Sequence, residues 1–208
     1  MIDTNLAAAT TTPPSPLLLV QLRAATADEH RAIEAAMPLV RPDVSLADYR
    51  GYLQRMWGVH VPFEARLDAL ADELGALVPQ LERRRRRASL AADLRALGAG
   101  DAALAALPLC AELPALAAHD GTALGALYVL EGSTLGGQLI RRHLAAVLGD
   151  EVAPALAYVS GYGSDTGSLW SSFRGALERF GGARPDAHAG VIAGASAMFR
   201  AVRLWVSP

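Results

Sequence analysis

Apolar residues recur every three to four positions along most of this chain, which is the spacing of amphipathic helices. Between about residues 16 and 37, this period places one apolar face at Leu18, Leu22, Ala25, Ile33 and Met37. The same pattern, bounded by Pro and Gly, predicts long helices over residues 45–74, 79–97, 120–149, 169–181 and from 185 onward. Runs of β-branched and aromatic residues are scarce, so strands are not expected.

Two of these helices have recognisable N-terminal signals. The tetrapeptide Ser45-Leu-Ala-Asp48 resembles a capping box, with Asp in place of the usual Glu. Pro62 is expected to kink the helix that follows it. Asp120, just after His119, is the predicted N-cap of the helix over residues 120–149.

The composition favours one all-α domain. The 208 residues are enough to bury a substantial core, and they are 52% hydrophobic, mainly Ala and Leu, with only 6% aromatic residues. Residues 1–16 are rich in Thr, Ala and Pro and lack the positive region of a signal peptide. The predicted organisation is therefore a disordered N-terminal tail over residues 1–16, followed by a helical domain over residues 17–208.

Charge and cysteine content exclude several classes of protein. The formal net charge is −2 and the isoelectric point is near 6.2, so no basic field attracts nucleic acid or an anionic membrane. No run of about 18 apolar residues is free of polar interruption, so no membrane-spanning segment is predicted. The single cysteine, Cys110, rules out an internal disulfide framework and suits the reducing cytoplasm, and it is expected to be a small buried hydrophobe.

Five consecutive arginines, Arg83–Arg87, form the strongest charge run. On a helix they would spread around most of the circumference, so they do not form one binding stripe. We predict a solvated face, with a surface for an acidic partner as the alternative.

The segment 124–140 is the most unusual of the predicted helices. It is mostly apolar, yet Gly132, Gly136 and Gly137 lie in its middle, and each interior glycine costs a helix roughly 0.5–1 kcal/mol relative to alanine. Gly132 and Gly136 lie about 40° apart on the helix surface, with Ser133 beside them. The glycines indicate a kink and bare backbone that a flat object can approach, or close packing of another helix.

The histidines offer few metal sites. His60, near Trp57 and Pro62, is expected to be structural, and the other three outside the first helix, at 119, 143 and 188, are expected in loops, caps or on the surface. No His-x-x-x-His, Glu-x-x-His or Cys/His cluster supports zinc or a di-iron centre. No glycine-rich loop follows a strand, so nucleotide binding is not predicted.

His30 differs from the others because of its neighbours. Glu34 lies one turn away, where it can hold one ring nitrogen of the imidazole while the other binds a metal. Arg23 lies two turns earlier on nearly the same side, about 10.5 Å along the axis, a distance suited to a propionate of haem. From spacing alone, an ordinary surface ion pair and a solvated arginine explain the same residues.

Two motifs carry a resemblance to a known family. Ala25-Thr-Ala-Asp-Glu-His-Arg-Ala-Ile-Glu34 resembles the proximal-helix motif of haem oxygenases, and Tyr128-Val-Leu-Glu-Gly-Ser-Thr-Leu-Gly-Gly-Gln138 resembles their distal-helix motif. The second motif has the form seen in bacterial haem oxygenases associated with bacteriophytochromes. The motifs occur in the family's order, and a weak similarity extends over about residues 17–206.

This resemblance implies an all-helical fold with haem between a proximal and a kinked distal helix. His30 would be the axial iron ligand, and Gly132, Ser133, Gly136 and Gly137 would pass over the opposite face. The implied reaction is the opening of haem to biliverdin, carbon monoxide and ferrous iron, with O2 and electrons from a separate reductase or ferredoxin. The close distal backbone would orient the reacting oxygen toward a meso carbon at the ring edge. Haem is then both substrate and cofactor, and a bacteriophytochrome is a candidate recipient of the biliverdin.

The family pattern also assigns basic residues to the haem propionates. Arg23 falls at one such position, and Arg174, in the helix over residues 169–181, is the central basic residue at the other. Arg141 and Arg142 are expected to face solvent or the redox partner.

One departure from the family concerns the distal motif. Many haem oxygenases have an aspartate there that anchors waters, but no aspartate occurs between Tyr128 and Gln138, and Ser133 is the nearest polar candidate. A hydroxyl is shorter and uncharged. The leading interpretation is a cytoplasmic haem oxygenase. The alternatives are a non-catalytic haem carrier or sensor on the same fold, and a helical interaction protein whose glycines only allow tight packing.

Overall fold

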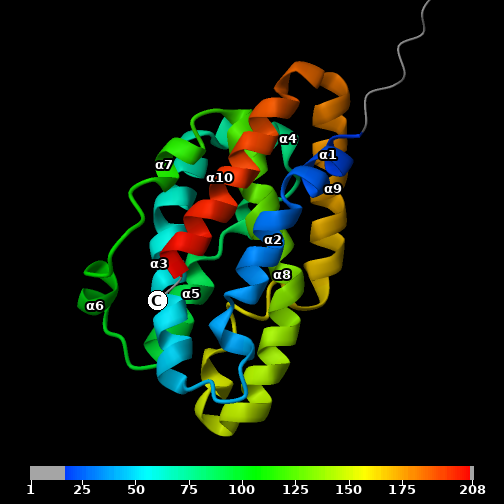
Figure 1. Ribbon diagram of the computed structural model, residues 1–208. Coiled ribbons are helices and arrows are strands. Elements are labelled where there is room, and N and C mark those ends of the chain that lie inside the picture. The colour runs from blue at the N-terminus through cyan, green and yellow to red at the C-terminus, as the bar shows by residue number, and fades with distance from the viewer. Residues whose placement is uncertain (1–16, 207–208) are drawn as a thin grey trace, which may run out of the picture.

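The computed structural model describes residues 17–206, and within that range it is built of helices, with no strand (Figure 1). The α-helices are α1 Leu18–Ala25, α2 Ala27–Ala35, α3 Leu46–Ala69, α4 Ala71–Leu77, α5 Arg87–Ala96, α6 Asp101–Ala105, α7 Leu113–Leu116, α8 Asp120–Leu148, α9 Thr166–Ala183 and α10 His188–Val206. Short 3-10 helices span Pro38–Val40, Leu81–Arg84, Gly149–Glu151, Ala153–Ala155, Gly163–Asp165 and Pro185–Ala187. The all-α prediction is confirmed, and the predicted tail, residues 1–16, lies outside the described residues.

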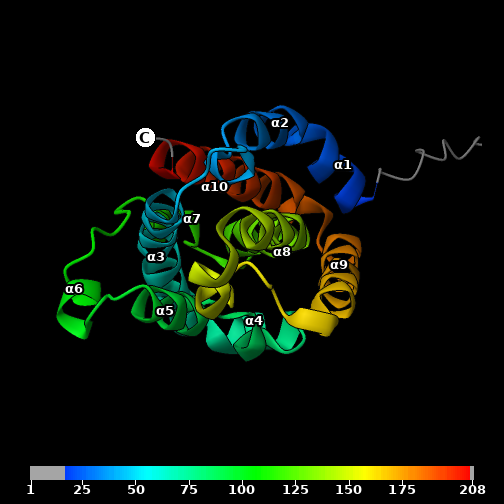
Figure 2. The same ribbon diagram turned by 90° about the horizontal axis from the view of Figure 1, so that it is seen from below.

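The central element is α8, and the other helices pack around it. Seen from below in Figure 2, α10, α1 and α2 lie along one side of α8, α3 and α5 along another, and α9 along a third. The most extensive contact joins α8 to α10. A Cβ atom on Gly125 would lie 1.9 Å from the carbonyl oxygen of Val191, and one on Gly194 would lie 2.2 Å from that of Thr122. Glycine at both positions therefore lets the two backbones touch.

The last helix, α10, is apolar enough to be tested as a membrane segment. Residues 185–206 are long and hydrophobic enough to cross a membrane by length and composition alone. In this structure Val191, Met198 and Val202 are buried in the shared core. The helix is therefore accounted for as a core helix of the bundle.

Of the two predicted helix N-termini, the cap of α3 is confirmed and the cap of α8 is wrong. The Ser45–Asp48 capping box is present, because Asp48 N donates to Ser45 Oγ at 3.1 Å and Ser45 N donates to Asp48 Oδ2 at 2.9 Å. The prediction that Asp120 is an N-cap is wrong. His119 is the N-cap of α8, with Thr122 N donating to its Nδ1 at 3.5 Å, and Asp120 is the first helical residue.

Three predicted helices are divided in the structure. The helix expected over 45–74 ends at Ala69, and α4 begins at Ala71. The helix expected over 16–37 breaks at Thr26, whose hydroxyl donates to the carbonyl of Leu22 at 2.7 Å and whose backbone leaves the helical region. The helix expected over 79–97 is a 3-10 turn over Leu81–Arg84 followed by α5. In this segment Arg84 and Arg86 are buried, whereas Arg83 and Arg87 are exposed.

The arginine run is therefore not a solvated face. Arg84 is 3% exposed and forms an ion pair with Glu131, while its guanidinium also donates to the carbonyl of Leu169 at 3.1 Å. Arg86 is 7% exposed and donates to the carbonyl of Tyr158 at 2.6 Å. These two side chains hold α8 and the loop that follows it to the 81–87 segment, so their role is internal.

Candidate functional site

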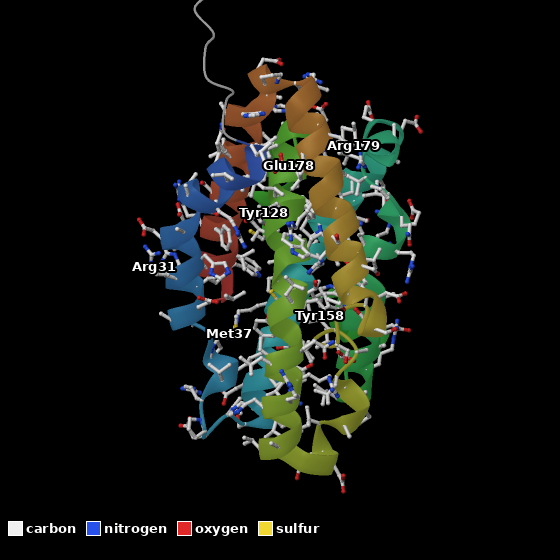
Figure 3. The ribbon with its side chains drawn as sticks, turned by 90° about the vertical axis from the view of Figure 1, so that its right-hand side faces the viewer. Arg31, Met37, Tyr128, Tyr158, Glu178 and Arg179 are labelled. Atoms are coloured by element: carbon white, nitrogen blue, oxygen red, sulfur yellow. The ribbon has the colours of Figure 1, made fainter. Side chains whose placement is uncertain are left out.

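One large cavity of about 1120 Å³ lies between α2 and α8 and extends to α3, α10 and the loop residues Tyr158 and Val159. Cavities for small ligands commonly measure about 300–1,000 Å³, so this cavity is slightly larger than that range. Its wall is mainly apolar. Figure 3 shows its two sides, with Arg31 and Met37 labelled on the α2 side and Tyr158 beside α8 away from α2.

On the α2 side, His30 and Glu34 both line the cavity. His30 Nδ1 lies 3.3 Å from Glu34 Oε2, and the imidazole meets the ring of Phe199 edge-on at a centroid distance of 5.9 Å. These contacts place Nδ1 beside Glu34 and the ring edge-on to Phe199. Nε2 is then the ring nitrogen available to a metal in the cavity.

The polar end of the cavity contains Arg23 and Tyr128. Burial raises the pKa of the Tyr128 hydroxyl, and the nearby charges of Arg23 and Arg174 oppose that rise. Arg23 lines the cavity, whereas Arg174 is an exposed residue of α9 that does not. Both cations therefore act on the same end of the site, and an anionic group of a ligand would be favoured there.

On the α8 side, the three glycines have different surroundings. A Cβ on Gly137 would lie 2.5 Å from the carbonyl oxygen of Val159, so the backbone of the loop packs directly on this glycine and leaves no room for a side chain. A Cβ on Gly132 would make an ordinary contact with Trp170 at 3.7 Å, and one on Gly136 would meet nothing within 4 Å. Packing thus explains Gly137, while Gly136 presents bare backbone to open space in the cavity wall.

The helix α8 continues through all three glycines without a break. The hydroxyl of Ser133 donates to the carbonyl of Leu130 at 2.7 Å, one turn earlier. Ser133 lines the cavity, so its oxygen lone pairs remain as acceptors on this wall.

A buried polar group at the deep end of the cavity was not recognised from the sequence. His60, expected to be structural, is indeed buried, at 3% exposed, but its side chain also lines the cavity. Its Nδ1 lies 3.2 Å from Glu64 Oε1, and its Nε2 lies 3.0 Å from the Tyr158 hydroxyl. The available signal was the spacing His60-x-x-x-Glu64, the same as that of His30 and Glu34.

Seven of the eight predicted site residues line this one cavity, and Arg174 is the exception. The seven are His30, Glu34, Arg23, Gly132, Ser133, Gly136 and Gly137. They come from segments about 100 residues apart in the chain. Among the described residues, no cluster of three or more His, Cys, Asp or Glu side chains could hold a metal ion by itself.

The fold and the cavity define a class: an all-helical protein with a large apolar cavity, one imidazole nitrogen available on one side, and exposed helix backbone on the other. Such a site suits a flat, metal-bearing ligand. The family model described as "Heme oxygenase" matches residues 17–207. The chain belongs to the haem oxygenase family of haem-degrading enzymes.

Individual relatives agree with this assignment. A "Heme oxygenase" from Xanthomonas campestris pv. campestris (strain 8004) is 36% identical over 139 residues, which cover 64% of this chain and 74% of the relative. The heme oxygenase of Leptospira interrogans superposes with a TM-score of 0.78 at 17% identity, covering 91% of this chain and 98% of that one.

Two further solved structures have the same fold. Heme oxygenase-1 from the cyanobacterium Synechocystis sp. PCC6803, in complex with heme, gives a TM-score of 0.74 at 17% identity, over 91% of this chain and 90% of that one. Heme oxygenase 2 from Chlamydomonas reinhardtii, without heme, gives 0.72 at 20% identity, over 92% and 98%. The fold is thus that of the heme oxygenases.

Proposed function

We propose that this protein opens haem to biliverdin, carbon monoxide and ferrous iron, with His30 as the axial ligand. The observation that carries the proposal is the position of His30. His30, with its Nδ1 3.3 Å from Glu34 Oε2, lines the same cavity as Gly136 of α8. Haem would supply both the iron centre for O2 chemistry and the ring that is cleaved.

Each wall of the cavity has a defined part in this proposal. Glu34 Oε2, 3.3 Å from Nδ1 of His30, would accept its proton in the haem complex, which would fix the tautomer and increase the basicity of Nε2. Arg23 provides a cation for a propionate at the Tyr128 end, and Arg174 adds to the positive potential there from the α9 surface. These residues orient the ring, and the orientation determines which of its edges lies beneath α8.

The α8 wall limits the space above the ring. Gly136 leaves room for a ligand directly against the helix backbone, and Gly132 and Gly137 flank that position. Ser133 occupies the place where many family members have an aspartate, and its oxygen can accept hydrogen bonds from water. The close backbone restricts the direction in which a small molecule can lie, which is an orientation effect on the reaction.

The electrons would come from a reductase or a ferredoxin, as the resemblance to haem oxygenases implies. We also propose a cytoplasmic location and a bacteriophytochrome as a recipient of the biliverdin.

A non-catalytic haem carrier or sensor is the second candidate. Its support is Ser133, which is uncharged and whose proton is directed to the carbonyl of Leu130. If Ser133 is the only polar group acting on the distal side, proton supply to the reaction would be poor.

Haem binding is the first experiment. Titration with haemin should give a Soret band with a 1:1 end point, and His30→Ala should remove the ligand-dependent spectrum. His143→Ala is the matched control, because His143 is also on a helix but lies outside the cavity, where it contacts the carbonyl of Arg41. An unchanged spectrum in His30→Ala would disprove the assignment of the axial ligand.

Turnover is the second experiment. The haem complex, supplied with ascorbate or a reductase in air, should yield a biliverdin spectrum and carbon monoxide. Stable haem without pigment would favour the carrier. Gly136→Val should reduce turnover or haem uptake while the helix remains folded, because the added side chain enters open space and not the core. Wild-type rates in Gly136→Val would contradict the proposed role of the α8 wall.

A further inference from the structure

The deep end of the cavity contains a chain of four hydrogen-bonded side chains that the proposed function does not yet use. It consists of Tyr52, His60 and Glu64 of α3 and Tyr158 of the loop after α8, and we refer to it as the His60 chain. Tyr52, His60 and Tyr158 line the cavity, while Glu64 lies behind them. All four are less than 10% exposed.

The inner end of the chain is an ionised carboxylate. Burial alone would raise the pKa of Glu64, but the hydrogen bond and charge of His60 and the backbone N–H groups of Arg86 and Arg87 hold it below its usual value. Arg86 N and Arg87 N donate to Glu64 Oε1 at 2.7 and 3.0 Å. Because a carboxylate can only accept, the His60 Nδ1 that faces Glu64 must carry a proton.

The outer end of the chain consists of two phenols that remain protonated. Burial raises the pKa of Tyr52 to about 12, although its hydrogen bond with Tyr158 lowers it, and burial raises the pKa of Tyr158 well above its usual value. Both hydroxyls are therefore O–H groups and not phenolates at neutral pH. His60 Nε2 meets the Tyr158 hydroxyl at 3.0 Å.

The loop that contains Tyr158 packs directly on the glycine-bearing part of α8. The next residue, Val159, has its carbonyl against Gly137, and Gln138 Nε2 donates to the carbonyl of Ser160 at 2.8 Å. The His60 chain therefore enters the cavity on the α8 side, away from α2 and His30. This is the side on which the sequence lacks the aspartate common in the family.

We propose that the His60 chain is a proton relay into the α8 side of the cavity and performs the acid function that Ser133 cannot perform. The inference rests on the proposed function. His60 acts through Tyr158 and Tyr52, so it is a positioning and relay residue.

The proton balance of one transfer closes within the chain. In the charged state His60 carries protons on both nitrogens, and Nδ1–H faces Glu64 while Nε2–H faces Tyr158. One proton leaves Tyr52 for an acceptor in the cavity, Tyr158 replaces it, and the Nε2 proton of His60 replaces that of Tyr158. His60 ends as a neutral imidazole with its Nδ1 proton still on Glu64. The net change is one proton moved from His60 to the cavity, and a proton from solvent restores the charged state.

The charges around the chain are compatible with this cycle. The Arg86 guanidinium lies 5.5 Å from the centre of the Tyr158 ring and donates to the Tyr158 carbonyl. Asp93 of α5 accepts from the backbone N–H of Tyr158 at 2.7 Å. A second cation, Arg85, donates to the Glu64 carbonyl at 3.4 Å. Two guanidinium groups and two carboxylates, Asp93 and Glu64, therefore surround the chain.

The first test needs no haem. In the apo-protein with 15N-labelled histidine, two-bond 1H–15N correlation spectra recorded between pH 5 and 9 should show the neutral form of His60 protonated at Nδ1. Glu64→Leu, which removes the acceptor oxygen, should abolish that preference. A neutral His60 protonated at Nε2 in the wild type would overturn the proposal.

The second test separates relay from structure. Tyr158→Phe keeps the ring but removes the hydroxyl, and it should slow ring opening about 10- to 100-fold, in the range expected for a lost proton-transfer group. Its pH–rate profile and solvent isotope effect should change, with haem affinity within twofold of wild type. Tyr162→Phe is the matched control, since the half-buried Tyr162 also packs against Arg86 but donates to Glu131 outside the chain.

The outcomes distinguish the relay from the proposed function. If the wild type forms no biliverdin, the proposed function fails and the relay fails with it. If the wild type is active and Tyr158→Phe has a parallel pH–rate profile and an unchanged isotope effect, only the relay is overturned.

Discussion

Two histidines face one cavity, and each has a glutamate four residues later on the same helix. His30 and Glu34 lie 3.3 Å apart with side chains 57% and 65% exposed, whereas His60 and Glu64 lie 3.2 Å apart with side chains 4% and 3% exposed. The local geometry is nearly the same. The difference comes from the helix, because α2 has no buried residue and α3 passes through the core.

This contrast shows that burial determines the roles for which the same His–Glu pair is suited. An exposed pair contributes little to stability but leaves its imidazole accessible to a ligand. A buried pair must satisfy its polar atoms within the protein, so it is expensive to break and its protonation is coupled to the fold. We therefore expect substitutions in the exposed pair to affect haem binding. Substitutions in the buried pair should affect the stability of the fold and proton transfer.

The largest expected effect is on stability. Glu64→Ala removes the acceptor for two backbone N–H groups and for His60, and each unsatisfied buried donor costs about 1–3 kcal/mol. We predict a loss of about 4 kcal/mol in the free energy of unfolding, measured by urea denaturation. Glu34→Ala, the matched change in the exposed pair, should stay within about 0.5 kcal/mol of wild type. Equal losses in the two variants would remove the basis of the comparison.

The second largest effect is on haem affinity. His30→Ala should weaken haemin binding about 100-fold, which is about 2.7 kcal/mol, while the free energy of unfolding of the apo-protein hardly changes. His60→Ala should do the reverse, with a clear loss of stability and little change in the dissociation constant for haemin. The comparison is broken if His60→Ala abolishes the Soret band and His30→Ala retains it.

The third effect tests the carboxylate that orients His30. Glu34→Gln should weaken haemin binding about 10-fold, because outer partners of metal-binding histidines typically contribute 10- to 100-fold in affinity. The control is Glu29→Gln on the same helix, since Glu29 does not line the cavity. If both variants bind haemin equally, Glu34 does not orient the ligand.

Much of the fold could be predicted because its signals are local. The capping box at Ser45 and the glycine end of α8, where Gly149 has a φ of 58°, depend on residues close in sequence. The break at Thr26 was missed, because a threonine that bonds back to Leu22 looks like any other helical threonine in the sequence.

The burial of Arg84 and Arg86 could not be predicted, because their partners are far away in the chain. Glu131 lies 47 residues after Arg84, and the carbonyl of Tyr158 lies 72 residues after Arg86. A single carboxylate within the apolar segment around Glu131 was the available hint. The roles of the seven cavity residues stay predictions, since lining a cavity does not establish a function.

The smallest expected effect is on how the free energy of unfolding depends on pH. This dependence should distinguish the buried pair of His60 and Glu64 from the exposed pair of His30 and Glu34. His60 and the backbone N–H groups of Arg86 and Arg87 outweigh burial and hold the pKa of Glu64 below its usual value in the folded protein. A lowered pKa means that the ionised carboxylate stabilises the fold above the unfolded-state pKa, and that this contribution is lost as pH falls through the folded-state value. The stability difference between wild type and Glu64→Gln should therefore be fully present at pH 7 and shrink below about pH 4.3. The exposed pair serves as the control, because Glu34→Gln should remain within about 0.5 kcal/mol of wild type at both pH values. A Glu64→Gln difference that is constant from pH 7 to pH 3 would mean that Glu64 is not held as a carboxylate, and it would also remove the acceptor that fixes the proton on Nδ1 of His60.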